Sequence, residues 1–377
     1  MSDARTLVVI FLRGGVDGLS AVIPYEDDEY RRARPLLAVP APKPGAADGD
    51  GPIRLDDRFA LSADLAALRP SWDAGRLAVL HAVGSDDSTR SHFEAQDQMD
   101  HGASEKQSLA GGWIARWLRS AGETGALSAV AFGTALPESL RGAPSACALE
   151  SLDQLGVTTK TGDTKGFAAA LAALHPTSGP GATALVRKGA RDALALLDRV
   201  DDLRRDTKAE SQDVPRSDLA RALSQTARLV RADLGLRAVT VDHGGFDTHF
   251  GQKVALPGQL RDFAEALAHF DKALGDARDR VTTLCITEFG RRLRENSSFG
   301  TDHGRGSVAF ALGGGVRGGR VVCDWPGLAD DQLDEGIDLR VTTDYRDLLW
   351  ETLSKRFGAT DVAAVLPGHA AKTVGVF

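Results

Sequence analysis

The feature that most constrains the fold is a series of apolar runs with the length of β-strands. Thr6–Leu12 and residues 77–83 are almost continuously apolar, as expected for strands that are buried on both faces of a sheet. Segments with helical spacing of apolar residues alternate with these runs, which indicates an α/β fold with a mostly parallel sheet. In such a sheet the strands end along one edge, so the residues that follow them meet there.

The same two patterns predict further elements. Shorter strands are expected at residues 128–132, 146–149, 236–241, 281–287, 308–312 and 320–323, and helices at residues 62–68, 113–120, 260–274 and 344–357. The stretch 160–235 is rich in Ala, Leu, Arg and Asp. We interpret it as a helical insertion or cap within a single domain that spans residues 1–377.

The composition excludes several classes of protein. The chain has 377 residues and a net charge of −7, which does not suit a nucleic-acid-binding surface. No apolar run approaches the roughly 20 residues that span a bilayer, so no membrane partner is expected. Three cysteines, an odd number, argue against a disulfide framework. The chain as written leads into its first strand without an export leader, so we expect it in the cytoplasm; the sequence indicates no oligomeric state.

Metal-binding residue types follow several of the predicted strands. The segment RGGVDG at residues 13–18 places Asp17 in a turn where a backbone can approach a ligand closely, although Asp is also common in ordinary turns. The segment DHGGFDTH at residues 242–249 includes Asp247 and His249, and its donors suit zinc, manganese or iron. Its alternative interpretation is a polar loop with solvated histidines.

Two later loops carry the same residue types. Glu288 follows a predicted strand and precedes Arg291, so the carboxylate is a candidate for holding a metal while the guanidinium grips an oxyanion. A surface ion pair is the alternative. Asp302 and His303 precede the strand predicted at 308–312. Carboxylates and imidazoles gathered at one edge of a sheet would repel, and a bound cation is the simplest way to compensate them.

A serine marks the predicted start of a helix after the strand 77–83. Ser91 and Glu94 have the spacing of a capping box, which is the structural interpretation. The functional interpretation is a nucleophile, because a helix N-terminus favours a bound anion and a metal lowers the pKa of a hydroxyl. Ser88 and Thr89 are competing hydroxyls in the same loop, and Arg90 adds a guanidinium beside them.

Five motifs together resemble the family of domain of unknown function 1501. They are LRGGVDGL at 12–19, RSHFE at 90–94, GFDTH at 245–249, TEFGR at 287–291 and GTDHG at 300–304. That family is similar to the alkaline-phosphatase-like superfamily of phosphatases, sulfatases and phosphoglycerate mutases. The resemblance implies a three-layer α/β sandwich with a central, mostly parallel sheet, and many relatives carry an export leader.

The resemblance also implies roles for individual residues. Ser91 would be the nucleophile, with Arg90 or Arg291 stabilising the charge on the oxyanion. One or two divalent ions, zinc or manganese, would be the cofactors. Their implied ligands are Asp17, Asp247, His249, Glu288 and His303, with Asp302 or His92 as the residue that completes the set.

The expected function is hydrolysis of a phosphate or sulfate ester of a small anionic molecule by a metal-dependent enzyme. The alternative is a non-catalytic metal-binding or scaffold protein that keeps the fold with a degenerate site. A fold alone does not decide between them.

Overall fold

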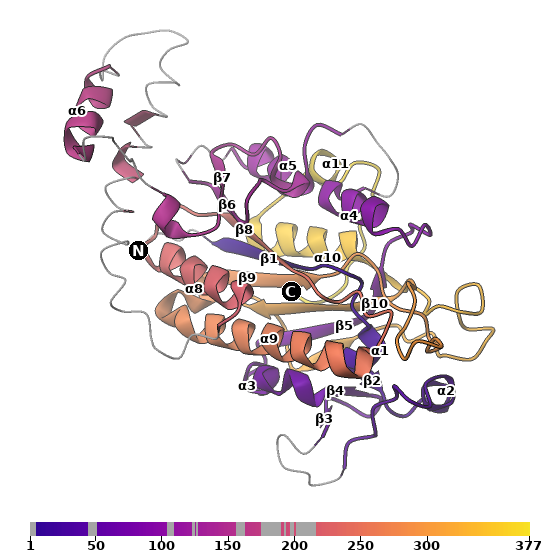
Figure 1. Ribbon diagram of the computed structural model, residues 1–377. Helices are drawn as coiled ribbons and strands as arrows, with labels where there is room; N and C mark the ends of the chain where they lie inside the picture. Colours follow the sequence, from indigo (N-terminus) through magenta and orange to yellow (C-terminus); the bar gives the residue numbers. More distant parts are fainter. Residues whose placement is uncertain are drawn as a thin grey trace.

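The computed structural model describes residues 5–43, 51–103, 109–122, 125, 127–155, 163–174, 190–191, 194–196, 200 and 216–377. Its centre is a nine-stranded sheet in the order β11-β5-β10-β9-β1-β8-β6-β7, with β12 paired to β5 (Figure 1). The strands are β1 (Thr6–Leu12), β5 (Leu77–Gly84), β6 (Ala129–Phe132), β7 (Ala146–Leu149), β8 (Ala238–His243), β9 (Val281–Ile286), β10 (Ser307–Gly313), β11 (Arg320–Val322) and β12 (Thr343–Asp344).

The sheet is mostly parallel. β1 pairs in parallel with β8 and β9, and β6 pairs in parallel with β7 and β8. Within the sheet as described, β10 alone runs the other way, because it pairs antiparallel with both β9 and β5. The strand predictions are confirmed, and β1 has the predicted bounds because all seven of its residues are buried.

Helices cover both faces of the sheet. They are α3 (Arg69–Asp73), α4 (His92–His101), α5 (Trp113–Ser120), α8 (Asp218–Arg231), α9 (Gln252–Ala273), α10 (Tyr345–Glu351) and α11 (Val362–Val365). The side chains of β1 alternate between two cores. Val8 and Ile10 pack with α8 and α9 in one core, whereas Leu7 and Val9 pack with α5, α10 and α11 in the other. The expected three-layer α/β sandwich with a mostly parallel central sheet is confirmed.

Short elements complete the body. A three-stranded sheet is formed by β2 (Val22–Pro24), β4 (Phe59–Leu61) and β3 (Ile53–Arg54). Other short helices are α1 (Gly18–Ala21), α2 (Asp28–Ala33), the 3-10 helices Ala63–Leu68, Glu138–Leu140, Leu152–Gln154 and Gly275–Arg280, and the π-helix Thr352–Arg356, which continues α10. None of the helices in the described part of the chain has the length and apolar character needed to cross a bilayer.

Most of the predicted insertion at 160–235 lies outside the described residues. Of its described parts, α6 (Thr164–Leu174) projects from the sheet beyond β7 in Figure 1. In contrast, α8 packs on the sheet, where Leu219, Leu223 and Val230 are buried in the core. The helical character predicted for these two segments is present.

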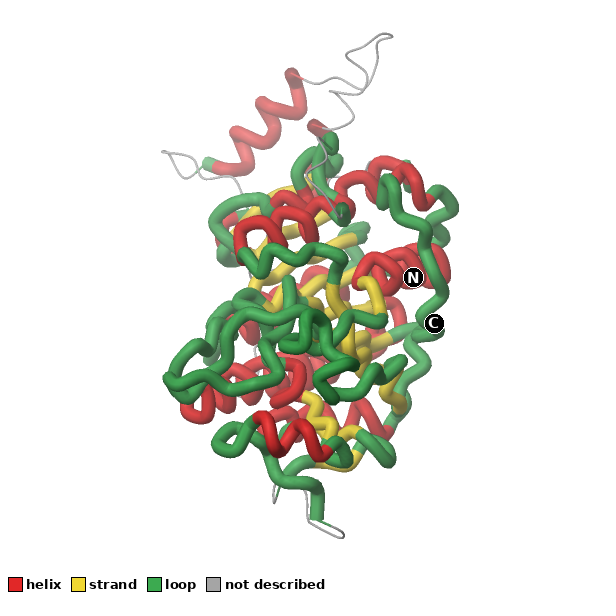
Figure 2. The backbone as a smooth tube through the Cα atoms, turned by 90° about the vertical axis from the view of Figure 1, so that its right-hand side faces the viewer, coloured by secondary structure: helices red, strands yellow, loops and turns green. Residues whose placement is uncertain are grey.

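Loops gather at the edge where the parallel strands end. Figure 2 faces this edge and shows long loops crossing it. The segments that follow β1, β5, β8 and β9 all arrive here. Because β10 is antiparallel, the loop that precedes it arrives at the same edge. Five chain segments that are distant in sequence therefore meet in one place.

Candidate metal centre

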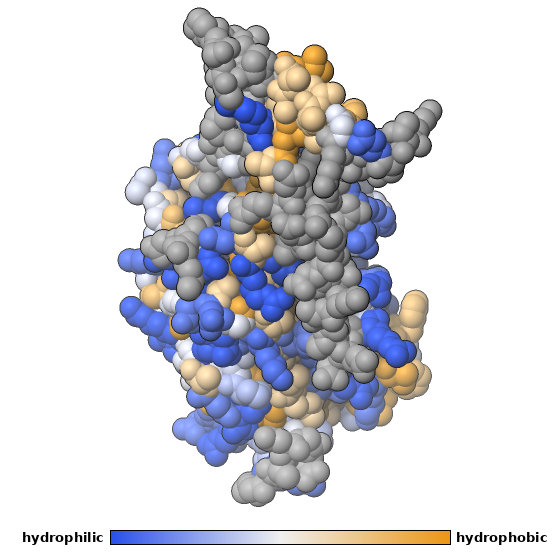
Figure 3. All heavy atoms as spheres, turned by 90° about the vertical axis from the view of Figure 1, so that its left-hand side faces the viewer, coloured by the Kyte–Doolittle hydropathy of each residue, from blue (hydrophilic) through white to orange (hydrophobic). Residues whose placement is uncertain are grey.

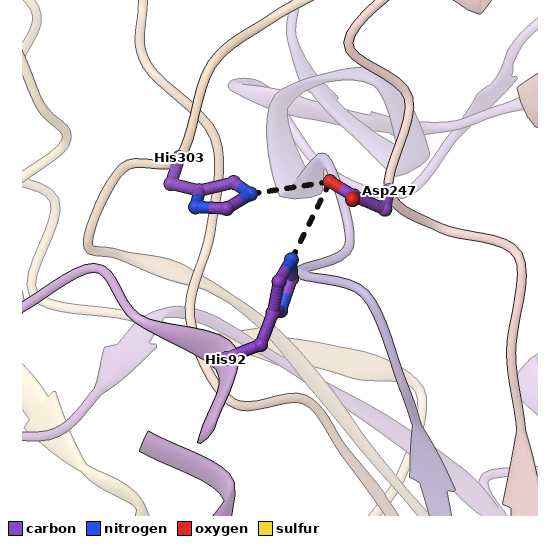
Figure 4. Close-up of side chains that lie close together, drawn as sticks. All are labelled: His92, Asp247 and His303. Atoms are coloured by element: carbon purple, nitrogen blue, oxygen red, sulfur yellow. Dashed lines mark hydrogen bonds and ion pairs between the residues drawn. The ribbon is translucent and has the colours of Figure 1, made fainter. Parts of the chain in front are cut away.

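The centre of this edge is a cluster of His92, Asp247 and His303 (Figure 4). Oδ1 of Asp247 lies 3.1 Å from Nε2 of His303 and 3.4 Å from Nε2 of His92. His249 extends the cluster, since its Nε2 lies 3.1 Å from the same Asp247 oxygen and 2.9 Å from Nε2 of His303. Three imidazoles thus direct Nε2 at one carboxylate oxygen.

Each of these imidazoles is held from behind through its Nδ1 atom. Nδ1 of His92 lies 2.9 Å from Oε1 of Glu288, and Nδ1 of His303 lies 2.8 Å from the carbonyl oxygen of Arg90. Nδ1 of His249 lies 3.1 Å from Oδ1 of Asp302. A carbonyl or carboxylate oxygen can only accept, so each Nδ1 carries a proton, and each ring, when it is neutral, presents a lone pair on Nε2. Oxygen acceptors behind histidines are the usual outer partners of metal ligands.

This arrangement fits a divalent cation. Nε2 of His92 is buried and has no hydrogen-bond partner among the described residues, since its contact with Asp247 lacks hydrogen-bond geometry. Lone pairs on nitrogen that face each other and a carboxylate oxygen repel unless a proton or a cation lies between them. Imidazole nitrogen and carboxylate oxygen are donors that zinc and other transition metals accept.

Charge at the centre is anionic. Burial would raise the pKa of Asp247, but the hydrogen bond and the positive charge of Arg291 hold it well below its ordinary value. Burial lowers the pKa of His303, which keeps its ring neutral and able to coordinate. Near neutral pH the centre therefore offers an ionised carboxylate together with the neutral imidazole of His303, whereas the hydrogen bond to Glu288 raises the pKa of His92.

Glu288 supports the centre from one layer further out. It is buried, and its Oε1 accepts hydrogen bonds from the Gly14 backbone N–H at 2.8 Å and from Nε2 of Gln96 at 2.8 Å, besides the one from His92. Burial would raise its pKa, but these hydrogen bonds, first that of His92, lower it to about 2. The structure therefore places the predicted ligand Glu288 behind an imidazole, with Oε1 already accepting three donors.

Asp17 has different partners from the other predicted ligands. Its Oδ2 lies 2.6 Å from Nη1 of Arg34 and its Oδ1 lies 3.0 Å from Nη2, with both side chains fully buried. Ser20 also donates to Oδ2 at 2.6 Å, and Gln252 contributes an amide. Burial alone would raise the pKa of Asp17, but Arg34 lowers it. Asp17 is thus compensated by a guanidinium, and the prediction that it binds a metal stays a prediction.

Ser91 lies at the N-terminus of α4, as the sequence indicates. It is the N-cap residue, but its side chain makes no capping hydrogen bond, so the capping-box interpretation is not realised through its hydroxyl. Of the competing hydroxyls, Thr89 is engaged, because it donates to Asp87 at 2.8 Å and accepts from the Ser91 backbone N–H. Ser91 directly precedes His92, which brings its backbone to the centre.

The two predicted oxyanion-binding arginines are paired with protein groups. Arg90 contacts Oδ2 of Asp338 at 2.6 Å and Oε2 of Glu335 at 2.8 Å. Arg291 is buried and donates to backbone carbonyl oxygens of Gly15 and Thr301, among others, and to Asp247 at 2.6 Å. Both arginines position other parts of the site, Arg90 through its carbonyl oxygen and Arg291 through Asp247.

His92 is the residue that the sequence interpretation undervalued. It enters there only as an alternative to Asp302, whereas the structure places it in the central cluster and places Asp302 behind His249. The available signal was its position: it opens the helix that follows β5, one of the strands that ends at this edge. Asp242 lies elsewhere, paired with Arg13 at 3.2 Å.

Fold and site together define a three-layer α/β protein with a histidine- and aspartate-rich centre at the carboxyl edge of its sheet. A family model for a protein of unknown function (DUF1501) matches residues 149–369, more than half of the chain. The chain belongs to this family. The matched region includes the loops of Asp247, Glu288 and His303, while Ser91 and His92 precede it. No curated protein matches the chain.

Several solved structures are similar to this chain. The alkaline phosphatase from the Antarctic bacterium TAB5 aligns over 95% of this chain and 100% of that chain, with 11% identity and a TM-score of 0.41. A phosphonate monoester hydrolase of Agrobacterium radiobacter aligns over 98% of this chain and 79% of that chain, with 12% identity and a TM-score of 0.37. Because these scores are low, the fold assignment rests on the sheet order and the layers themselves.

Proposed function

We propose that this protein is a metal-dependent hydrolase of a phosphate or sulfate ester, with Ser91 as its nucleophile. The observation that carries the proposal is the convergence of Nε2 atoms from His92, His249 and His303 on one oxygen of Asp247. This centre adjoins the N-terminus of a ten-residue helix whose N-cap hydroxyl makes no cap. A cation site, an anion-binding helix end and an available hydroxyl are what ester hydrolysis of this kind needs.

The proposed ligands are His92, Asp247 and His303, with His249 as a fourth at the margin. Glu288, Asp302 and the carbonyl oxygen of Arg90 orient the imidazoles. Zinc or manganese suits this set of nitrogen and oxygen donors. A divalent cation held here would supply Lewis acidity toward the ester oxygen and would lower the pKa of a nearby hydroxyl.

The chain's own groups account for the rest of the reaction. The Ser91 hydroxyl loses its proton as its oxygen forms a bond to the phosphorus or sulfur atom, and the ester oxygen leaves with its electron pair and takes up a proton. Water then cleaves the seryl ester and restores the hydroxyl. The first N–H groups of α4 have no acceptor within the helix, so they stabilise the negative charge of the anion.

The test measures metal content and turnover separately. The protein is stripped with a chelator, reloaded with zinc or manganese, and assayed on p-nitrophenyl phosphate, bis(p-nitrophenyl) phosphate and p-nitrophenyl sulfate. Ser91→Ala is expected to retain the metal and lose turnover, whereas the control Ser88→Ala retains both. If Ser91→Ala retains the turnover of the wild type, Ser91 is not the nucleophile. If the wild-type protein binds neither metal, the proposed function is rejected.

One observation favours a second candidate, a non-catalytic metal-binding or scaffold protein. The guanidinium groups of Arg90 and Arg291, which would be expected to face an oxyanion, are already paired with acids and carbonyls. For this candidate, the wild-type protein would bind one metal ion per chain and hydrolyse none of the three esters.

A further inference from the structure

Exposed phenylalanines are concentrated beside the metal centre. Among the described residues, the three most exposed phenylalanines are Phe93 at 90%, Phe250 at 75% and Phe299 at 61%. Phe93 directly follows His92, Phe250 directly follows His249, and Phe299 precedes Asp302 by three positions. A single exposed apolar side chain is ordinary, but three large ones beside one polar centre require an explanation.

Two of these rings lie on loops that are joined to each other. The Gly251 N–H donates to the carbonyl oxygen of Ser298 at 3.0 Å, and the Gln252 N–H donates to the carbonyl oxygen of Phe299 at 2.9 Å. Phe250 and Phe299 therefore come from adjacent stretches of backbone. Val254, four residues after Phe250 in the first turn of α9, is also 86% exposed.

The backbone at Phe299 is an independent indication. Its φ is +60°, in the left-handed region that a bulky side chain rarely adopts. Glycine is the residue that adopts this conformation most easily, yet the chain has a phenylalanine at this position. Neither burial nor backbone preference accounts for a phenylalanine here. Unfavourable backbone conformations of this kind concentrate at functional sites.

We propose that Phe93, Phe250 and Phe299, called here the phenylalanine rim, bind the apolar part of the substrate. This inference rests on the proposed function and names its substrate class: an amphiphilic ester whose anionic group lies at the metal centre and whose large apolar group packs on the rim. The organic group of an ester bound at the centre must lie next to the centre. A macromolecule covering the whole rim would instead close the centre to substrate.

The experiment compares two non-hydrolysable anions that differ only in their apolar part. Binding of phenylphosphonate and of methylphosphonate to the zinc-loaded protein is measured by isothermal titration calorimetry. The wild-type protein is expected to bind phenylphosphonate about tenfold more tightly, because one phenyl group is partly removed from water. In Phe250→Ala/Phe299→Ala this preference is expected to fall to about threefold or less, while the zinc content stays at one ion per chain.

A matched control lies at the far end of the molecule. Figure 3 shows the side of the molecule that lies on the left in Figure 1. An apolar surface lies near its top, the end where Figure 1 places α6. Phe167 of α6 is 48% exposed, so Phe167→Ala removes a comparable ring away from the centre. This variant should retain the wild-type preference for phenylphosphonate.

The other outcomes separate the two proposals. If the zinc-loaded wild-type protein binds neither phosphonate, the proposed function is wrong. If it binds both with equal affinity, the hydrolase proposal survives and the rim proposal is rejected. Sedimentation analysis is run in parallel: a wild-type dimer that Phe250→Ala/Phe299→Ala converts to a monomer would identify the rim as an interface between copies and would also reject it.

Discussion

Asp17 and Asp247 follow the neighbouring parallel strands β1 and β8 in glycine-containing loops, yet their surroundings are opposite. Asp17 is fully buried, and both of its oxygens are held by Arg34. Asp247 is half exposed and receives one nitrogen from Arg291, whose other contacts go to backbone carbonyls. The imidazoles of His249 and His303 also contact Oδ1 of Asp247.

The comparison shows what distinguishes a structural acid from a candidate metal ligand. A guanidinium that donates both nitrogens satisfies a carboxylate, so no cation is needed there. A carboxylate surrounded by imidazoles that are themselves held through Nδ1 still faces uncompensated lone pairs. The partners, and not the acid or its glycine neighbours, therefore decide the role.

The largest expected effect is on stability, from a change in the buried ion pair of Asp17 and Arg34. Asp17→Asn should lower the free energy of unfolding by about 3–5 kcal/mol, because it leaves the Arg34 guanidinium buried with an incomplete partner. Urea denaturation in the presence of a chelator measures this without a contribution from metal. A variant that is as stable as the wild type but has lost its metal would make Asp17 a ligand and remove the contrast with Asp247.

The converse change should affect metal binding and leave stability nearly intact. Asp247→Asn removes the charge on which the imidazoles converge, so zinc affinity should fall by at least about 100-fold. Competition with a chromophoric chelator measures the affinity. Asp242→Asn is the control, because Asp242 is exposed, lies in β8 just before the loop of Asp247 and, within the described part of the chain, forms its ion pair with Arg13. Unchanged zinc affinity in Asp247→Asn would contradict the assignment of the centre.

A histidine that is satisfied by protein groups, unlike those at the metal centre, should make the stability of the protein depend on pH. His81 is fully buried; its Nε2 lies 2.9 Å from the carbonyl oxygen of Val22, and its Nδ1 accepts from the Ala82 N–H. Burial lowers the pKa of His81 to about 4 from an unfolded value of about 6.5. The contribution of neutral His81 to stability is therefore fully present above the unfolded pKa and is lost as the pH falls toward 4.

Between pH 7 and pH 5 this histidine should cost about 2 kcal/mol of unfolding free energy. Denaturant titrations of wild type and His81→Gln at both pH values, with chelator present, measure the difference. The variant should lose less stability on acidification than the wild type by about this amount. Equal losses of unfolding free energy in the two proteins would show that His81 is not a buried, neutral side chain that must take up a proton on unfolding.

The sequence was informative where burial is local. Thr6–Leu12 has the predicted bounds since every residue of the strand is buried, and α5 has them since its apolar spacing is regular. The helix expected at 260–274 instead begins at Gln252, in spite of Pro257 inside it. That start is set by a distant contact, the hydrogen bond from the Gln252 N–H to the carbonyl oxygen of Phe299.

The site was predictable by location and less so by role. Strand ends at one edge of a sheet identify Asp247, His249 and His303 as neighbours before any coordinates. The partners of an acid depend on contacts outside its own motif: Arg34 lies 17 residues from Asp17, and Gln252 lies 235 residues from it. Spacing along the chain contains no information about such contacts, so the sequence predicts Asp17 and Glu288 as metal ligands without distinguishing their surroundings.

Glu288 gives the smallest expected effect and the finest test of the comparison, because it is buried like Asp17 but faces an imidazole like Asp247. Glu288→Gln keeps the shape and an oxygen acceptor for His92, so zinc affinity should fall only about tenfold, near the lower end of what outer-layer changes cause. The control Gln96→Ala removes a different donor to the same Glu288 oxygen and should have a smaller effect. A loss as large as that of Asp247→Asn would place Glu288 directly on the metal. No loss at all would mean that the imidazole of His92 keeps its orientation without the carboxylate, and the distinction between inner and outer acids at this edge would disappear.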